Sequence, residues 1–257
     1  MRINHNISAL NTNRQMMVNH NAASKSMEKL SSGLRINRAA DDAAGLSISE
    51  KMRAQIRSLE QATRNAQDGI SFIQTAEGAL NEVSDMLGRM KELKVQSANG
   101  TYDTTDTGNI DLELEALGAA IDKILTDTSF NGKNMLKSDF EGVSITDDAG
   151  AAIVSISKIT FAGGLDEAST IAEIDTAIEN VNKDRAQFGA YQNQLEHTIN
   201  NLSTTTENLT SSESRIRDVD MAMEMTEFTK NSILLQASQA MLAQANSQPQ
   251  NILQLLR

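Results

Sequence analysis

The chain has 257 residues, a formal net charge of −11, and 39% hydrophobic but only 3% aromatic residues. The acidic balance argues against a nucleic-acid-binding protein, because phosphate contacts need clustered lysine and arginine. The absence of cysteine excludes disulfides and thiolate metal sites. So few aromatic residues, together with a single proline at Pro249, are typical of long amphipathic helices and not of a large globular core.

Neither end of the sequence predicts a membrane segment. Residues 1–17 lack the apolar stretch of a cleaved secretory signal peptide. Residues 231–256 carry no charge, but their six glutamines make them too polar to span a bilayer. We therefore expect no membrane partner.

The first 34 residues are predicted to form a helix, because apolar residues such as Ile3, Ile7 and Leu10 recur at helical spacing. Gly33 suits the end of this helix. Residues 35–43 show no clear period and are expected to be a connection. Asp41 or Asp42 is a suitable cap for the helix that follows.

A second and much longer helix is predicted over residues 44–98. Apolar residues repeat every seven positions, which is typical of helices that wind around each other. Ile56 and Ile70 lie between these positions, and near Val83 and Met90 we expect the apolar stripe to shift. The repeat consists of Met52, Leu59, Ala66, Ile73, Leu80 and Leu87.

The middle of the chain changes period. A third helix is predicted over about 106–127, followed by a turn at Asn131-Gly132. From about 135 to 165 apolar and polar residues alternate around a connection at 147–150, which predicts a β-hairpin. The apolar residues of the third helix are Ile110, Leu114, Leu117, Ile121 and Ile124.

Another long seven-residue repeat begins at Ile174. Ile178 and Ile199 are the apolar residues between its positions. A straight helix from Ile174 to Ile216 would span about 65 Å, so we expect it to pair antiparallel with the second helix as a coiled-coil rod. The repeat consists of Ile174, Val181, Phe188, Leu195, Leu202, Leu209, Ile216 and Met223.

The last helix is apolar nearly all round, with a seven-residue repeat at Met221, Phe228, Leu235 and Leu242. No charge occurs between Lys230 and Arg257, so this helix must be buried. Only the first helix remains to cover it, and two such helices cannot enclose one another on every face. We therefore expect the two ends of the chain to pair and the pair to pack against other copies.

Catalytic and metal sites are not expected. The histidines, His5, His20 and His197, are far apart in the sequence and form no metal-ligand motif. The pairs Asp41-Asp42 and Asp147-Asp148 are better explained by helix capping and turn formation. No cofactor is predicted, and the chain is not expected to be an enzyme.

Several long runs of residues closely resemble bacterial flagellin. At the N-terminal side these runs cover 23–59, 65–80, ELKVQSANGT at 92–101 and SFNGKNML at 129–136. At the C-terminal side they cover SRIRDVDMAMEM at 214–225 and residues 233–257. Together they lie in roughly the first 136 and the last 85 residues, so the resemblance is far more specific than a short motif.

The resemblance implies a structural subunit of the flagellar filament, secreted to the outside of the cell without a cleaved signal peptide. It divides the chain into 1–43, the first part of an inner core domain with its connection; 44–215, a rod domain with the β-hairpin; and 216–257, the rest of the core domain. Large outer domains should be absent, because only about 35 residues separate Leu136 from the long helix near Thr170. The residues expected to pack in the filament core are Ile3, Ile7, Leu10, Met221, Phe228, Leu235 and Leu242.

The resemblance also implies partners. These are further copies in a helical polymer, an export chaperone on the C-terminal helix, the filament cap and hook-junction proteins, and Toll-like receptor 5 through Arg89, Leu93 and Glu113. The ends of the isolated monomer are expected to be disordered and to gain helix on assembly. Two alternatives remain open: a hook–filament junction protein, and a secreted helical protein that binds a host receptor.

Overall fold

The computed structural model describes residues 6–134, 136, 140–144, 152–156 and 169–255. The fold is mainly helical, with long helices and short hairpins, which confirms the predicted fold class. It forms two compact units, the terminal unit (Met1–Ala54 with Asn208–Arg257) and the central unit (Gln55–Glu207). The elements are α1 (Ile7–Ser32), α2 (Ala43–Ser97), α3 (Thr104–Asp127), β1 (Ser129–Phe130), β2 (Lys133–Asn134), β3 (Phe140–Ser144), β4 (Ala152–Ile156), α4 (Ile171–Arg217) and α5 (Met221–Leu255).

Local side-chain chemistry explains where the helices begin and end. Gly33 terminates α1 in the left-handed conformation, at φ 70°, as the sequence predicts. Asp42 caps α2 by accepting the backbone N–H of Gly45 at 2.9 Å. At the start of α4, Thr170 and Glu173 bond to each other's backbone N–H groups at 2.7 and 3.3 Å, the reciprocal arrangement called a capping box.

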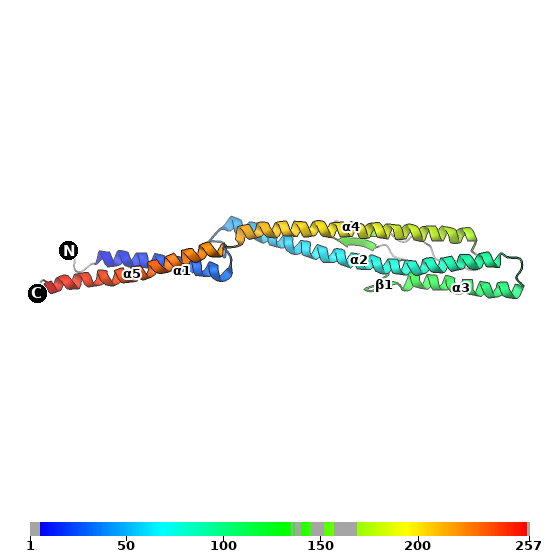
Figure 1. Cartoon of the computed structure of the whole chain (residues 1–257), viewed down its shortest axis with the longest axis horizontal. Coiled ribbons are helices and arrows are strands. Elements are labelled where there is room, and N and C mark those ends of the chain that lie inside the picture. The colour runs from blue at the N-terminus through cyan, green and yellow to red at the C-terminus, as the bar shows by residue number, and fades with distance from the viewer. Residues whose placement is uncertain (1–5, 135, 137–139, 145–151, 157–168, 256–257) are drawn as a thin grey trace. The chain divides into compact units, whose positions relative to one another are not determined.

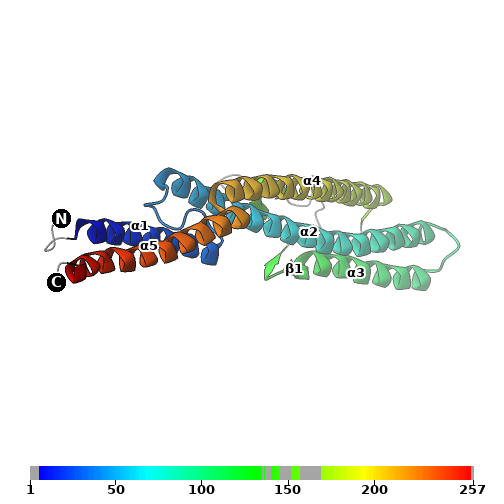
Figure 2. The ribbon, with the colours of Figure 1, turned by 60° about the vertical axis from the view of Figure 1, so that its left-hand side comes forward.

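In the central unit, α2 lies between α3 and α4 (Figures 1 and 2). Most of its buried apolar residues are spaced by three, four or seven positions, so they form one continuous stripe. The expected shift of this stripe near Val83 and Met90 is wrong. These two residues lie three positions after Leu80 and Leu87, as Ala76 lies three positions after Ile73, so the same spacing continues along the helix. The stripe consists of Ala62, Ala66, Ile73, Ala76, Leu80, Val83, Leu87 and Met90.

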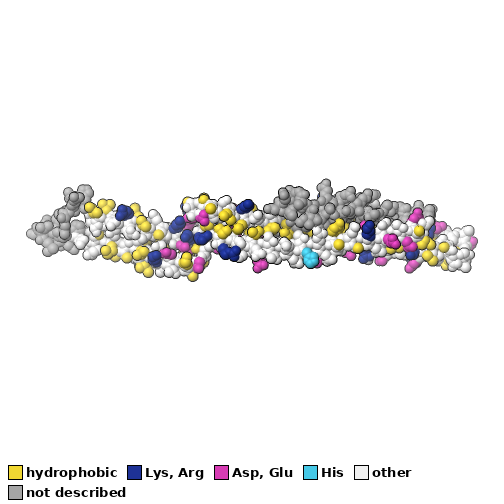
Figure 3. Space-filling model, turned by 90° about the horizontal axis from the view of Figure 1, so that it is seen from above, with side chains coloured by type: hydrophobic (Ala, Val, Ile, Leu, Met, Phe, Trp, Pro, Cys, Tyr) yellow, Lys and Arg dark blue, Asp and Glu magenta, His cyan; other side chains and the backbone are white. Residues whose placement is uncertain are grey.

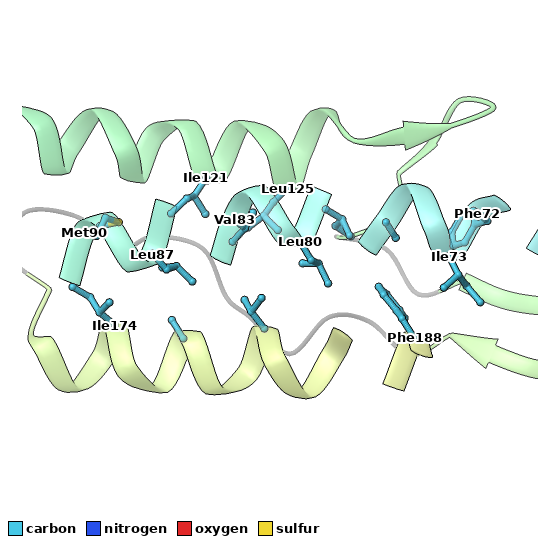
Figure 4. Close-up of a cluster of buried hydrophobic side chains, with 14 of the residues drawn as sticks. Phe72, Ile73, Leu80, Val83, Leu87, Met90, Ile121, Leu125, Ile174 and Phe188 are labelled. Atoms are coloured by element: carbon cyan, nitrogen blue, oxygen red, sulfur yellow. The ribbon is translucent and has the colours of Figure 1, made fainter. Parts of the chain in front are cut away.

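The facing stripe on α4 also follows this spacing. Three residues after the repeat positions Ile174 and Val181 come Ala177 and Asp184, and Asp184 is buried with only 4% of its surface exposed. Ile178 and Ile199, the residues suggested by the sequence, are only partly buried at the flank of the core. Figure 4 shows Ile174 and Phe188 of α4 directed toward the side chains of α2.

The residues predicted for the seam do not all lie in one unit. Leu59 is partly buried at the edge of the central core, whereas Met52 belongs to the terminal unit and is half-buried there. The buried members, all in the central core, are Ile73, Leu80, Val181, Phe188, Leu195 and Leu202.

The third helix contacts the other side of α2. Leu117 and Ile124, which the sequence included in its apolar face, are partly buried at the flank. The fully or nearly fully buried residues of α3 are Ile110, Leu114, Ile121 and Leu125. The face that α3 packs against α2 is therefore rotated slightly from the predicted one, with Leu125 buried where the sequence indicated Ile124.

A small hairpin follows α3. Asn131 and Gly132 both have positive φ, 51° and 77°, which is typical of a two-residue type I′ turn and joins β1 to β2. Phe130 of this hairpin packs edge-to-face on Phe72, with ring centroids 5.9 Å apart. The sequence predicted this turn but not its strands.

The hairpin predicted at about 135–165 is present. β3 and β4 pair antiparallel, with Phe140 opposite Ile156 and Ser144 opposite Ala152. Irregular register within the pair interrupts the ladder on either side of Val143. The connecting Asp147-Asp148 lies outside the described residues.

Candidate functional site

The terminal unit brings the two ends of the chain together as an antiparallel helix pair. α1 and α5 lie side by side in both ribbon views (Figures 1 and 2). Hydrogen bonds join the two helices at three points along their length, so these polar contacts help to fix the register of α1 against α5. Asn6 Nδ2 donates to the carbonyl of Ala245 at 2.8 Å, Asn19 Nδ2 to Ser238 Oγ at 3.1 Å, and Lys29 Nζ to the carboxylate of Glu224 at 3.4 Å.

Small or polar side chains fill the space between these two helices. The buried residues of α1 are Asn19, Ala23 and Ser26, and on α5 Ala245 is buried. Small side chains allow the helices to approach closely but remove little apolar surface from water. Phe228, Leu235 and Leu242 share this face of α5 but are only half-buried, and most other large hydrophobic side chains of the two helices lie outside the contact.

The surface of the helix pair is accordingly apolar. Among the described side chains of α1 and α5, eleven large hydrophobic residues are between 41% and 71% exposed. Monomeric soluble proteins rarely carry apolar surface at this density, which marks an interaction site. On the face drawn in Figure 3, hydrophobic side chains reach the surface of the described helices. The eleven are Ile7, Leu10, Met17, Val18, Met27, Met221, Met223, Met225, Ile233, Leu234 and Met241.

The residues predicted from the sequence to pack between subunits differ in how exposed they are in the structure. Ile3 lies outside the described residues. Ile7, Leu10 and Met221 are exposed. The repeat Phe228, Leu235 and Leu242 is half-buried.

Four further large residues of α5 are more exposed than this half-buried repeat. Met223, Ile233, Leu234 and Met241 were not among the residues predicted to pack in the filament core, although they are more exposed to solvent than the repeat. A helix that is apolar all round carries no sequence signal that separates its inner from its outer face.

A shallow groove of 360 Å³ runs between the two helices. Polar residues of α1, including Asn11 and Gln15, line one wall, and Leu234, Ala237 and Met241 of α5 line the other. Asn19 and Ser238, which also line it, are already hydrogen-bonded to each other. The groove therefore presents an apolar wall to whatever covers it.

The two breaks in the helical chain are held against each other. Leu34 and Asp218 form an isolated antiparallel β-bridge. The N–H of Arg35 donates to the carbonyl of Arg217 at 2.6 Å, and the N–H of Val219 donates to that of Gly33 at 3.1 Å. These bonds fix the points at which the chain enters and leaves the helix pair.

Ion pairs reinforce this connection. Lys25 Nζ lies 2.8 Å from the Asp41 carboxylate. This hydrogen bond, together with the backbone N–H of Arg38, lowers the pKa of Asp41, and the same pairing raises the pKa of Lys25. The Arg217 guanidinium binds Glu50 and lowers the pKa of that carboxyl.

The three residues suggested for receptor contact lie in the central unit. Arg89 Nη2 is 3.0 Å from the carboxylate of Glu113, and both side chains are about half exposed. The hydrogen bond to Glu113, and a second one to Glu92, raise the pKa of Arg89. Leu93 is only 2% exposed and belongs to the core, so Arg89 and Glu113 alone reach the surface.

Metal binding finds no support among the residues that the structure describes. His20 and His197 are exposed and lie in different units, while His5 is outside the described residues. No group of three or more histidine and carboxylate side chains that could hold an ion exists in the described part. Asp41 and Asp42 serve the connection and the cap of α2 instead.

Comparison with known proteins decides the family. A profile of the bacterial flagellin N-terminal helical region matches residues 3–141, and one of the C-terminal helical region matches residues 171–256. The chain belongs to the bacterial flagellins. This flagellin is a short form that consists of the N- and C-terminal helical regions, and it is a subunit of the bacterial flagellar filament, with no enzymatic activity.

Relatives match over their full length. The flagellin of Bacillus subtilis (strain 168) is 51% identical over 304 aligned residues, and that of Halalkalibacterium halodurans is 52% identical over 272, with each pair of chains covered completely. The flagellar filament 33 kDa core protein of Treponema phagedenis is 46% identical over 286 residues, again with complete coverage. A crystal structure of Bacillus cereus flagellin is 34% identical, with a TM-score of 0.47 over 54% of this chain and 88% of the other.

Among the described residues, no helix is both long and apolar enough to cross a bilayer.

Proposed function

We propose that this flagellin polymerises by burying the apolar surface of α1 and α5 between neighbouring copies. The observation that carries the proposal is the set of eleven large hydrophobic side chains left exposed on this helix pair. A contact between different faces of identical subunits generates a helical filament when its rotation does not close the subunits into a ring. In this arrangement the helix pair of the terminal unit belongs to the inner core domain, and the central unit belongs to the rod domain.

The energies involved make such assembly cooperative. Completing the burial of one half-exposed Leu, Ile or Met side chain contributes roughly 1 kcal/mol, so all eleven contribute roughly 10 kcal/mol. Bringing one subunit into fixed register costs about 4–15 kcal/mol of translational and rotational freedom. Because the two quantities are similar, most of the apolar surface must be covered at once, and the loss of a few contacts favours the monomer.

The decisive experiment places a charge on this surface without disturbing the helix pair. Ile233 is 59% exposed, so Ile233→Asp should leave the fold intact and abolish filament growth, because a carboxylate cannot be buried unpaired. Ile233→Leu is the matched control and should polymerise normally. Precipitant-induced assembly followed by electron microscopy and sedimentation measures the outcome. Normal filaments from Ile233→Asp would contradict the proposal.

The half-buried repeat provides a second pair of variants. Leu235→Asp and Leu242→Asp should also block assembly, while the helical signal of the central unit persists. Since these side chains also contribute to the pairing of α1 with α5, part of their effect arises within one molecule. Comparing them with Ile233→Asp separates contacts within a subunit from contacts between subunits.

The same apolar surface supports the proposal of an export chaperone on α5. Before assembly the exposed methionines and isoleucines of this helix face water, and flexible methionine side chains adapt to different partners. A chaperone that covers α5 would keep monomers apart until they are secreted to the extracellular flagellum. Cap and hook-junction proteins would cover it at the two ends of the filament, where no further copy is available.

Contact with Toll-like receptor 5 belongs to the central unit. Arg89 and Glu113 form a half-exposed ion pair that an acidic or basic receptor side chain could join, and Leu93 would support the helix beneath them. Arg89→Ala should reduce receptor activation by the monomer without affecting assembly. Unchanged activation would remove this residue from the proposed contact.

The alternatives differ in what they require. A hook–filament junction protein would be present in a few copies, whereas a filament subunit is present in thousands, and the relatives named above are flagellins and a filament core protein. A secreted receptor-binding protein would stay monomeric at high concentration. Concentration-dependent polymerisation of the purified chain therefore tests both alternatives.

A further inference from the structure

Methionine is distributed very unevenly between the two units. Nine of the twelve methionines belong to the terminal unit. In the central unit, Met90 is completely enclosed by the core and Met86 is half-buried. Among the described residues, the exposed methionines all lie on α1 or α5 and are between 48% and 71% exposed: Met17, Met27, Met221, Met223, Met225 and Met241.

These thioethers are the most reactive groups toward mild oxidants in this protein. The chain has neither cysteine nor tryptophan, so no thiol or indole competes for a peroxide. The sulfur lone pair attacks one peroxide oxygen and the O–O bond breaks. The proton of the transferred oxygen passes to the second oxygen, which leaves as water. The sulfur is oxidised by two electrons to a sulfoxide, and one hydrogen peroxide is reduced to one water.

A sulfoxide changes what the helix pair can bury. Met241 lines the apolar wall of the groove beside Leu234 and Ala237, and Met223 is the most exposed of the large hydrophobic side chains described on α5. Oxidation turns each side chain from an adaptable apolar group into a polar one with a strong hydrogen-bond acceptor. Burying that oxygen without a donor in an apolar contact is unfavourable.

We propose that the six exposed methionines are an oxidation site that controls assembly: peroxide converts them to sulfoxides in the monomer and prevents its incorporation into filaments. This inference rests on the proposed function, because it requires α1 and α5 to be covered by neighbouring copies. Within a filament the same sulfurs are shielded, so assembled subunits resist the oxidant. Methionine sulfoxide reductase reverses the modification.

The first experiment treats monomers and preformed filaments with the same concentration of hydrogen peroxide. Peptide mass spectrometry should find the six methionines oxidised in the monomer at least about tenfold faster than in the filament, with Met90 unmodified in both. Equal oxidation rates in monomer and filament would overturn the proposal. Met90 serves as the internal control, because its oxidation would report unfolding.

The second experiment measures assembly of the oxidised monomer. Its critical concentration should rise by about tenfold or more, and treatment with methionine sulfoxide reductase should restore the original value. A variant with all six exposed methionines changed to Leu should assemble and become insensitive to peroxide, since Leu is apolar and of similar volume. The control with Met86→Leu and Met90→Leu should remain sensitive.

The outcomes separate this inference from the proposed function. If untreated protein fails to polymerise, the proposed function itself fails. If untreated protein polymerises and fully oxidised monomer polymerises equally well, only the oxidation site is wrong. Peroxide sensitivity that persists in the six-Leu variant would likewise overturn it, and the reductase treatment decides the matter if that variant does not assemble.

Discussion

The two units of this flagellin pack helices in opposite ways. In the central unit the largest side chains are the most enclosed, and Leu80, Leu87, Leu114 and Leu195 have no exposed surface. In the α1–α5 pair of the terminal unit the buried residues are small or polar, whereas eleven large hydrophobic residues of the described part are exposed. The comparison teaches that one unit completes its core within a single chain and the other does not.

The number of helices explains the difference. In the central unit α2 has α3 on one side and α4 on the other, so its apolar stripe and both flanks are covered (Figure 4). In the terminal unit α1 and α5 have mainly each other, and a two-helix pair covers only one side of each helix. An apolar helix such as α5 then keeps most of its surface available for neighbouring copies.

The largest expected effect is on the central core. Leu80→Ala should lower the free energy of unfolding by about 2–5 kcal/mol, because the side chain is fully enclosed and leaves a cavity. Leu112→Ala, on the exposed side of α3, should cost less than about 0.5 kcal/mol. Urea unfolding followed by circular dichroism measures both. Equal losses would mean that the central core is not the stable part of the monomer.

The second prediction concerns local opening. Backbone amides of α1 and α5 should exchange with deuterium at least roughly a hundredfold faster in the monomer than in the filament, because few large side chains hold the pair closed. Amides in the central part of α2 should be protected in both states. Hydrogen exchange read by mass spectrometry tests this, and slow exchange of both ends in a dilute monomer would contradict it.

A third prediction uses two glycines with opposite backbone requirements. Gly33→Ala should destabilise the end of α1 by about 1–2 kcal/mol, because its φ of 70° is unfavourable for a residue with a Cβ. Gly78→Ala is the matched control, since Gly78 is exposed within α2 and has open space for the new methyl group. That change should stabilise the central unit by about 0.5–1 kcal/mol. Exchange protection in each helix distinguishes the two results.

The smallest expected effect is electrostatic. The pKa values of Asp41 and Glu50 are lowered from 3.8 and 4.5, so their pairing stabilises the connection above these values. This contribution should be lost as the pH falls through the lowered pKa values. The raised pKa of Lys25 predicts a further loss on the alkaline side, as the pH rises beyond 10.5.

A single substitution at Asp41 tests the predicted loss of stability at acidic pH. Asp41→Asn should remove the part of the pH dependence below about pH 4 that depends on the Lys25 pair, as followed by exchange of the Arg38 amide that bonds to Asp41. Because these groups are solvent-accessible, the change should be modest and should weaken with added salt. A pH profile that is unaltered in the variant would show that this pair does not hold the connection.

The sequence by itself determined the helices, their caps and the chemistry of the protein. Seven-residue repeats at Ile73 and Phe188 predict paired helices, and Gly33 and Asp42 mark boundaries through conformations and hydrogen bonds that depend only on nearby residues. The long uncharged run at the C-terminus indicates a helix that needs further partners.

Only the tertiary structure decided which side of each helix is covered. A repeat identifies a stripe, but its flank is chosen by the partner, which is why Asp184 is buried and Ile178 only partly so. The tertiary structure also placed Leu93 in the core, and it left Met223 and Ile233 exposed on a helix whose composition is apolar all round. Burial depends on residues that are distant in the sequence and meet only when the chain folds, so it cannot be read from local spacing.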